Sequence, residues 1–257
     1  MKFSWFWLAI RFLGGVVLLF VVAPLVGMAL HTSFPSLVEA GRDSEVTSSI
    51  WLTVWVSMVG TLFFALMGIP LAYVLARREF PFKSVVQGIV DLPVVIPHSA
   101  AGIALLGFIS RDSALGKVAS VVGLDLVGHP IGIAIAMAFV SIPFLVNAAR
   151  DGFAMVPERF EKAALTLGAS PVRVFFTISL PLAWRSIVSG MVMMFARGMS
   201  EFGAVIIVAY HPMVAPVLVY ERFSTFGLAY SRPAALLFII VSLAVFVLVR
   251  LLMQKKR

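Results

Sequence analysis

The chain alternates between long apolar runs and short polar connections. Six of the runs reach about 20 residues or more, which is long enough to cross a bilayer as an α-helix. They extend over residues 8–30, 51–76, 85–109, 131–149, 174–208 and 234–253. The pattern predicts an all-α membrane protein with about six transmembrane helices, in a single domain covering residues 1–257.

Prolines interrupt several of these runs. Pro93 and Pro97 fall within the third, Pro143 within the fourth, and Pro181 within the fifth, where it predicts a bend. Membrane helices tolerate proline where neighbouring helices or water satisfy the freed carbonyls, so these residues favour a packed bundle. The first run is too long for the core of a cleaved signal peptide, and we expect it to be retained.

Composition independently indicates a membrane protein. The chain is 61% hydrophobic and only 12% charged, with a mean hydropathy of +1.05, which lies far outside the range of soluble domains. It contains no cysteine, so disulfides, thiolate metal sites and cysteine nucleophiles are excluded. The four histidines are scattered over separate segments without metal-ligand spacing, and we expect no bound metal.

Lys and Arg are distributed unevenly over the predicted connections. If the N-terminus is cytoplasmic, six spans return the C-terminus to the cytoplasm, and most basic residues then lie on that side, as the positive-inside rule requires. The polar segment 157–171 falls on the same side. This topology accounts for the net charge of +8. No basic groove with interleaved aromatic residues indicates a nucleic-acid partner.

The segment 157–171 carries its own helix signals. Pro157 suits a first helical position, Glu158 and Glu161 suit the positive end of the helix dipole, and Gly168 can supply a left-handed stop. An apolar face repeats at helical spacing. Its members are Phe160, Ala163, Ala164 and Leu167. We interpret the segment as a short amphipathic helix that docks a soluble partner; the alternative is a helix lying on the lipid headgroups.

A second polar site lies inside the fifth run. Arg197 and Glu201 form an i,i+4 pair of opposite charge in an otherwise apolar segment, where charges usually face a bundle interior or water. The small residues Gly198, Ser200 and Gly203 allow close helix approach. The pair therefore either borders a translocation path or fixes helix packing, and packing is the stronger interpretation for Glu201.

Polar residues elsewhere in the spans allow the same two interpretations. His98 could hydrogen-bond an oxyanion or be a satisfied buried imidazole, and Ser99 and Asn147 could line a wet path or join neighbouring helices. For Asp91, a role in helix packing is favoured over binding of a proton or cation.

Catalytic motifs are missing from the sequence. It has no Walker lysine motif, no G-x-S-x-G and no H-E-x-x-H. The chain therefore cannot bind ATP by the usual P-loop, and any energy that it uses must come from a partner or an ion gradient. Six spans are few for a secondary transporter, and no internal repeat is visible. A homodimer would supply twelve spans and a path on its two-fold axis.

Several stretches carry a family resemblance. The spacing from Ala163-Ala164 through Gly168 to Ile178-Ser-Leu-Pro181 resembles the "EAA" coupling loop of permease subunits in binding-protein-dependent ABC importers, with Lys162 at the position of the family's Glu. Ala196-Arg-Gly-Met-Ser-Glu-Phe-Gly-Ala204 is similar to a pattern of molybdate and tungstate permeases. Asp91–His98 resembles the start of the third core span in those permeases, and Tyr210–Pro216 and Val219–Phe223 resemble the outer loop of the archaeal molybdate/tungstate type.

The resemblance implies a small ABC-importer permease fold in the plasma membrane and a transport function. The chain would be the homodimeric transmembrane subunit of an ATP-driven importer of tungstate or molybdate, passing the oxyanion inward by alternating access. Two cytoplasmic ATPase subunits and an external oxyanion-binding protein would be its partners. The chain itself would be no enzyme and bind no cofactor, since ATP and Mg²⁺ belong to the ATPase. A sulfate or other solute permease and a stand-alone channel or ion-coupled carrier are the alternatives.

Two sets of functional residues follow. The residues predicted to couple to the ATPase are Pro157, Glu158, Phe160, Glu161, Lys162, Ala163, Ala164, Leu167, Gly168 and Pro171. The candidates for the path or gate are Arg197, Gly198, Ser200, Glu201, His98 and Ser99.

Overall fold

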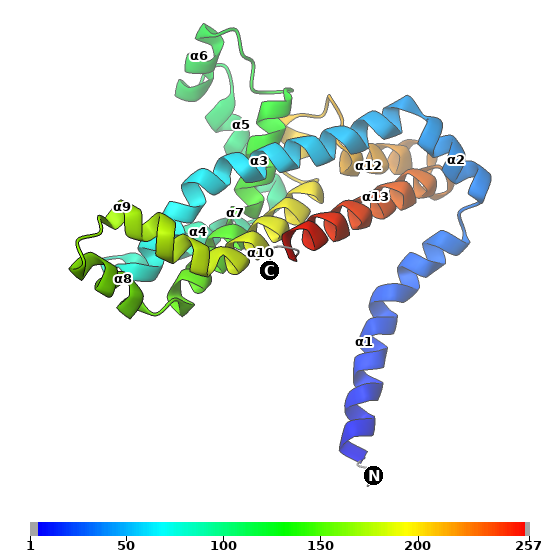
Figure 1. Cartoon of the computed structure of the whole chain (residues 1–257). Helices are drawn as coiled ribbons and strands as arrows, with labels where there is room; N and C mark the ends of the chain where they lie inside the picture. Colours follow the sequence, from blue (N-terminus) through cyan, green and yellow to red (C-terminus); the bar gives the residue numbers. More distant parts are fainter. Residues whose placement is uncertain (1–4, 255–257) are drawn as a thin grey trace.

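The computed structural model describes residues 5–254, with side chains to residue 251, and within these residues it contains helices and no strand (Figure 1). Helix α7 (Pro130–Met155) is central and packs along α3 (Ser44–Arg77) and α10 (Leu180–Met199). More than half of the most apolar stretch of α7, 56%, is buried within the chain. The predicted all-α membrane fold is confirmed.

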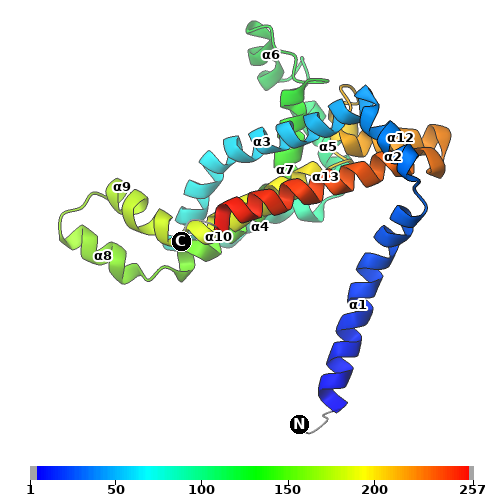
Figure 2. The ribbon, with the colours of Figure 1, turned by 45° about the vertical axis from the view of Figure 1, so that its right-hand side comes forward.

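Two long apolar helices contribute little to this core. Helix α1 (Trp5–Leu30) stands apart from the bundle in both views (Figures 1 and 2), and its most apolar stretch is 0% buried. Helix α13 (Leu228–Gln254) lies along the bundle with 6% of its stretch buried. The short helices α2 (Phe34–Arg42) and α12 (Ala215–Phe226) lie at the end of the bundle where α13 begins.

The third predicted span is a bent pair of helices. Helix α4 (Lys83–Val95) and α5 (His98–Ile109) meet at an angle of 111°. The break falls at Pro97, one of the two predicted interruptions, whereas Pro93 lies within α4. Within the described residues, five continuous helices are therefore long and apolar enough to cross a membrane, and there are six spans if the bent pair counts as one. A short helix, α6 (Ala114–Val121), projects beyond α5 (Figure 1).

The predicted C-terminal end of the fifth span, 174–208, is wrong. Its helical stretch starts at α9 (Pro171–Val174), passes through a π-helix, η1 (Phe175–Ser179), and ends with α10 at Met199; residues Val205–Val208 form a separate turn, α11. Pro181 lies in the first turn of α10, directly after the π-helix. A π-helix widens the hydrogen-bond register and so accommodates the missing proline donor.

The polar segment 157–171 forms helix α8 (Glu158–Thr166), which begins one residue later than predicted because Pro157 is the N-cap. Helix α8 lies at the end of the bundle where α3 and α13 finish and α10 starts, opposite α2 and α12 (Figures 1 and 2). Segment 157–171 and the end of α13 therefore share one side. The predicted cytoplasmic charges Lys2, Lys255, Lys256 and Arg257 lie outside the described residues.

Candidate functional site

Helix α8 ends in the left-handed stop that the sequence predicts. Gly168 has φ +87°. The amide of Ala169 donates to the carbonyl of Ala164, and the amide of Gly168 donates to that of Leu165, both at 3.0 Å. These two bonds form a Schellman motif, which satisfies carbonyls that the helix end would otherwise leave without partners. The loop after α8 is consequently set by local chemistry.

One side of α8 is anchored to the bundle through Glu161, a buried carboxylate with 8% exposure. Arg77 at the end of α3 donates from Nε and Nη2 to its Oε1, at 2.9 and 2.8 Å. The Ser179 hydroxyl donates to the same oxygen at 2.8 Å, and the Tyr73 hydroxyl donates to Oε2 at 3.3 Å. Arg77 also donates to the carbonyl of Val156 at 2.9 Å. Glu161 therefore joins α8 to α3 and to the π-helix.

Aromatic rings pack beneath this anchor. Tyr73 lies edge-on to Phe153 and Phe175, with ring centroids 5.1 and 4.9 Å apart, and Phe175 in turn contacts Phe176 at 5.0 Å. These edge-to-face pairs join α3, α7 and the π-helix, and they fix the hydroxyl of Tyr73 beside Glu161.

The rest of α8 is largely exposed and carries apolar and charged side chains together. Phe160 is 45% exposed and Leu167 is 88% exposed. Lys162 forms an exposed ion pair with Glu158 at 2.8 Å. The hydrogen bond from Lys162 lowers the pKa of the Glu158 carboxyl. Among the predicted coupling residues, Glu161 alone is buried. The others leave a face on which a partner could bind.

The predicted path candidates gather where two chain breaks meet. Glu201, which is fully buried, forms an ion pair through Oε2 with Arg197 at 2.9 Å, and the same oxygen lies 3.0 Å from Nδ1 of His98. Arg197 Nη2 lies 2.9 and 3.0 Å from the two ring nitrogens of His98. Oε1 of Glu201 accepts from the amide of Ala204 at 2.9 Å, which fixes the turn after α10. His98, which was predicted separately, thus joins the predicted pair of Arg197 and Glu201 in one cluster.

Small residues bring the two breaks into contact. A β-carbon at Gly203 would lie 2.8 Å from Cβ of His98, and one at Gly102 would lie 2.9 Å from the carbonyl oxygen of Ala204. Neither position has room for a side chain. Ser99 and Ser200 lie at the exposed edge of the cluster, where Ser200 accepts from Arg197 at 3.3 Å.

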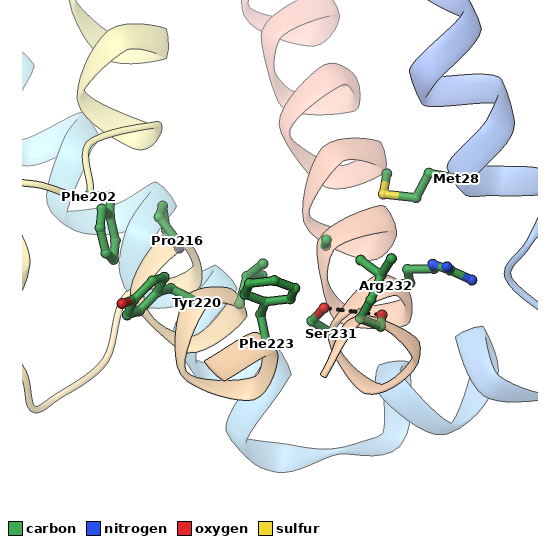
Figure 3. A pocket seen from close by; sticks show the side chains of 10 residues that line it. Met28, Phe202, Pro216, Tyr220, Phe223, Ser231 and Arg232 are labelled. Carbon is green, nitrogen blue, oxygen red and sulfur yellow. Dashed lines mark hydrogen bonds between the residues drawn. The ribbon is translucent and has the colours of Figure 1, made fainter. Parts of the chain in front are cut away.

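An apolar groove of about 350 Å³ lies between α12 and α13, near the end of α1 (Figure 3). Phe202, which directly follows Glu201, stacks at a tilt on Tyr220 with ring centroids 4.9 Å apart and forms one wall. Phe223 and Arg232 lie on the side toward α13. The groove and the charged cluster therefore share the segment after α10.

Several contacts escape sequence reasoning. From the sequence, Arg77 is only one of the basic residues that indicate the cytoplasmic side, but in the structure it forms an ion pair with Glu161. Asn147 donates to Asp91 at 2.6 Å, so α7 and α4 are joined by two residues that the sequence only offers as separate candidates. Arg222 of α12 pairs with Asp43 at 2.6 Å, and this hydrogen bond lowers the Asp43 pKa. Such pairs depend on which spans are neighbours.

Within residues 5–254, no group of three His, Asp or Glu side chains is placed to hold a metal ion.

The chain is similar to transport proteins. A family model described as binding-protein-dependent transport system inner membrane component matches residues 68–257. A molybdate/tungstate transport system permease protein WtpB of Methanocaldococcus jannaschii is 42% identical over 236 residues, covering 92% of each chain. The protein of the same name from Pyrococcus furiosus is 43% identical over 247 residues, covering 95% of this chain and 94% of that one.

A solved structure has the same fold. A bacterial ABC transporter involved in the import of the acidic polysaccharide alginate superposes with a TM-score of 0.74, at 18% identity, over 98% of this chain and 96% of that one.

Proposed function

The chain belongs to the family of binding-protein-dependent transport system inner membrane components, and from this membership we propose that it is the transmembrane subunit of an ATP-driven importer for a tetrahedral oxyanion, tungstate or molybdate. It is a multi-pass protein of the inner membrane. The substrate is the one that the names of the relatives at 42% and 43% identity give to those proteins.

The observation that carries the proposal is the two-sided character of α8. Its inner side is fixed by the buried Glu161, while Phe160 and Leu167 are exposed beside the Glu158–Lys162 pair. A helix lying on lipid headgroups would need no rigid anchor to the bundle, whereas a docking helix does, because it must pass on force. We therefore propose that α8 is the helix that binds a cytoplasmic ATPase.

Two copies of the chain would form the transporter, each taking one ATPase subunit on its α8. Helix α1 supports a dimer, since it is apolar apart from Arg11 and has almost no contact with its own bundle. A substrate-loaded external protein would dock on the opposite end. ATP and Mg²⁺ would be bound by the ATPase, and this chain would hold no cofactor.

The cluster of Arg197, Glu201 and His98 is the proposed border of the translocation path. Glu201 neutralises Arg197, so an oxyanion meets no bare carboxylate and no strong cationic trap. Ser99 and Ser200 complete the polar edge, while Gly198 lies on the buried side of α10, against Ser57 of α3 and Met137 of α7. Weak contacts suit a path from which cargo must leave. Closure of the two ATPase subunits on ATP would rock the two permease subunits from an inward-open to an outward-open state, and ATP hydrolysis would return them to the inward-open state.

The test is ATP hydrolysis by the subunit reconstituted in vesicles with its ATPase and binding protein. Tungstate, molybdate and sulfate are each supplied at matched loading of the binding protein. Stimulation by tungstate and molybdate, with little by sulfate, is the expected result. Stimulation by sulfate alone would show that sulfate, and not tungstate or molybdate, is the substrate. Transport without any ATPase would show that the protein is a channel or carrier and not an ABC importer subunit.

A further inference from the structure

One carboxylate joins three elements at the end of the bundle that carries α8. Glu161 of α8 accepts from Arg77, the last residue of α3, and from Ser179, the last residue of the π-helix. The side chains of Arg77 and Glu161 are only 8% and 10% exposed. A buried pair resists separation because the charge left behind would have no partner. Helix α8, the end of α3 and the start of α10 are therefore held as one unit.

The same two long helices remain joined far from α8. Ser57 of α3 donates to the backbone carbonyl of Phe195 in α10 at 2.8 Å, in a buried position. A β-carbon at Gly198 would lie only 2.7 Å from the Ser57 hydroxyl, so the backbones are in close approach there. From Ser179 to Arg197 the helix rises about 27 Å at 1.5 Å per residue. A displacement at the start of α10 is thus delivered to its far end.

At that far end α10 contacts a helix outside this unit. His98 is the first residue of α5, beyond the 111° bend, while Arg197 and Glu201 belong to α10 and the turn that follows it. The His98–Glu201 contact of 3.0 Å and the His98–Arg197 contact of 2.9 Å therefore join α5 to α10 and the turn that follows it. A shift of α10 relative to α5 acts directly on them.

We propose that Arg77, Glu161 and Ser179 are the link that converts movement of α8 into joint movement of α3 and α10, and that this movement opens the contact between His98 and Arg197. The inference rests on the proposed function, because it needs an ATPase that moves α8. The three are positioning residues. Glu161 is turned away from the exposed face of α8, so it is not available to a partner.

The experiment compares uptake with ATP consumption in the same vesicles, using the complete complex with tungstate. The variants are Glu161→Gln, Arg77→Met and the double variant. We expect ATPase association and basal hydrolysis within about twofold of wild type, and uptake per ATP reduced roughly tenfold or more. The double variant should be no worse than the poorer single, because both substitutions remove one link.

Glu79→Gln is the matched control. It breaks an exposed pair with Lys83, whose atoms are 2.7 Å apart, two positions beyond Arg77. Uptake per ATP should stay at the wild-type ratio. If the variants with altered charge fail to reach the membrane, Ser179→Ala decides, since it removes a single hydroxyl; uptake per ATP should then fall about threefold.

Three results would overturn the link. They are an unchanged ratio of uptake to ATP in Glu161→Gln or in the deciding Ser179→Ala, additive losses in the double variant, and loss of the ATPase from the purified complex. The last result would make Glu161 a docking residue. A wild-type complex that takes up no oxyanion would overturn the proposed function together with the link. This failure is distinguished from failure of the link alone because it is seen in the wild-type protein, without any variant.

Discussion

Replacement of Gly168 tests whether the loop after α8 depends on backbone conformation. Its φ of +87° lies in the left-handed region, and a β-carbon there would meet nothing within 4 Å. A side chain at this position therefore clashes with no part of its own chain. Any loss of function must come from the backbone or from the partner surface. Gly168→Val and Gly168→Asn separate these two causes, because the side chains are similar in size but asparagine tolerates this conformation.

The magnitude follows from two routes open to valine. Keeping the left-handed conformation costs about 2 kcal/mol for a β-branched residue. Abandoning it sacrifices the two capping hydrogen bonds, each 3.0 Å long, at about 1 kcal/mol each. Both routes give about 2 kcal/mol, so the ratio of chains with the intact loop to chains with any other loop conformation falls roughly 30-fold. For asparagine we expect well under 1 kcal/mol.

Uptake and ATPase association are measured in vesicles containing equal amounts of each variant. Gly168→Val should lose uptake and bind the ATPase weakly while inserting normally, and Gly168→Asn should retain most of both. If asparagine is as damaging as valine, occlusion of the partner surface is the cause and the conformational reasoning is refuted. Normal uptake by the valine variant would refute the docking assignment itself.

Three further outcomes are expected. Glu201→Gln removes a fully buried carboxylate from its pair with Arg197, whose side chain is 23% exposed, and should lower the free energy of unfolding by about 1.5–3 kcal/mol, measured as the loss of folded protein with temperature in detergent. Gly203→Val places a branched side chain where a β-carbon already comes within 2.8 Å of His98, so uptake should fall while ATPase association persists. Because Arg222 lowers the Asp43 pKa, this carboxylate stabilises the fold above its unfolded pKa of about 3.8, and stability should fall as the pH drops below that value, less steeply in Asp43→Asn.

Local chemistry made some features predictable. Gly168 was placed as a left-handed stop because a helix end needs such a residue within one turn. Pro97 marked the break between α4 and α5 for a similar reason, although its angle of 111° could not be read from the sequence. The end of α10 at Met199 was missed because Glu201 and the close packing of Gly203 on His98 stop the helix, and both act through tertiary contacts.

The anchor beneath α8 shows the same limit. Glu161 and Arg77 are 84 positions apart. Each had a sufficient local explanation, Glu161 as a charge at a helix start and Arg77 as a basic residue at the end of a span. Their pairing, and the π-helix that brings Ser179 to the same carboxylate, depend on which spans lie side by side. Hydrophobic periodicity does not contain that information.

The bend at Pro97 has a consequence for how the protein is made. Helices α4 and α5, with 13 and 12 residues, extend only about 20 Å each, so neither alone crosses a hydrocarbon core of about 30 Å. The broken backbone between them needs cover from protein or water, and the segment that packs on it, Ser200 to Ala204, is synthesised about 100 residues later. In a nascent chain, the bent pair of α4 and α5 can therefore complete its packing only after α10 and the turn that follows it have been synthesised. Chains that stop short of it would present an unfinished membrane segment to the cell's proteases.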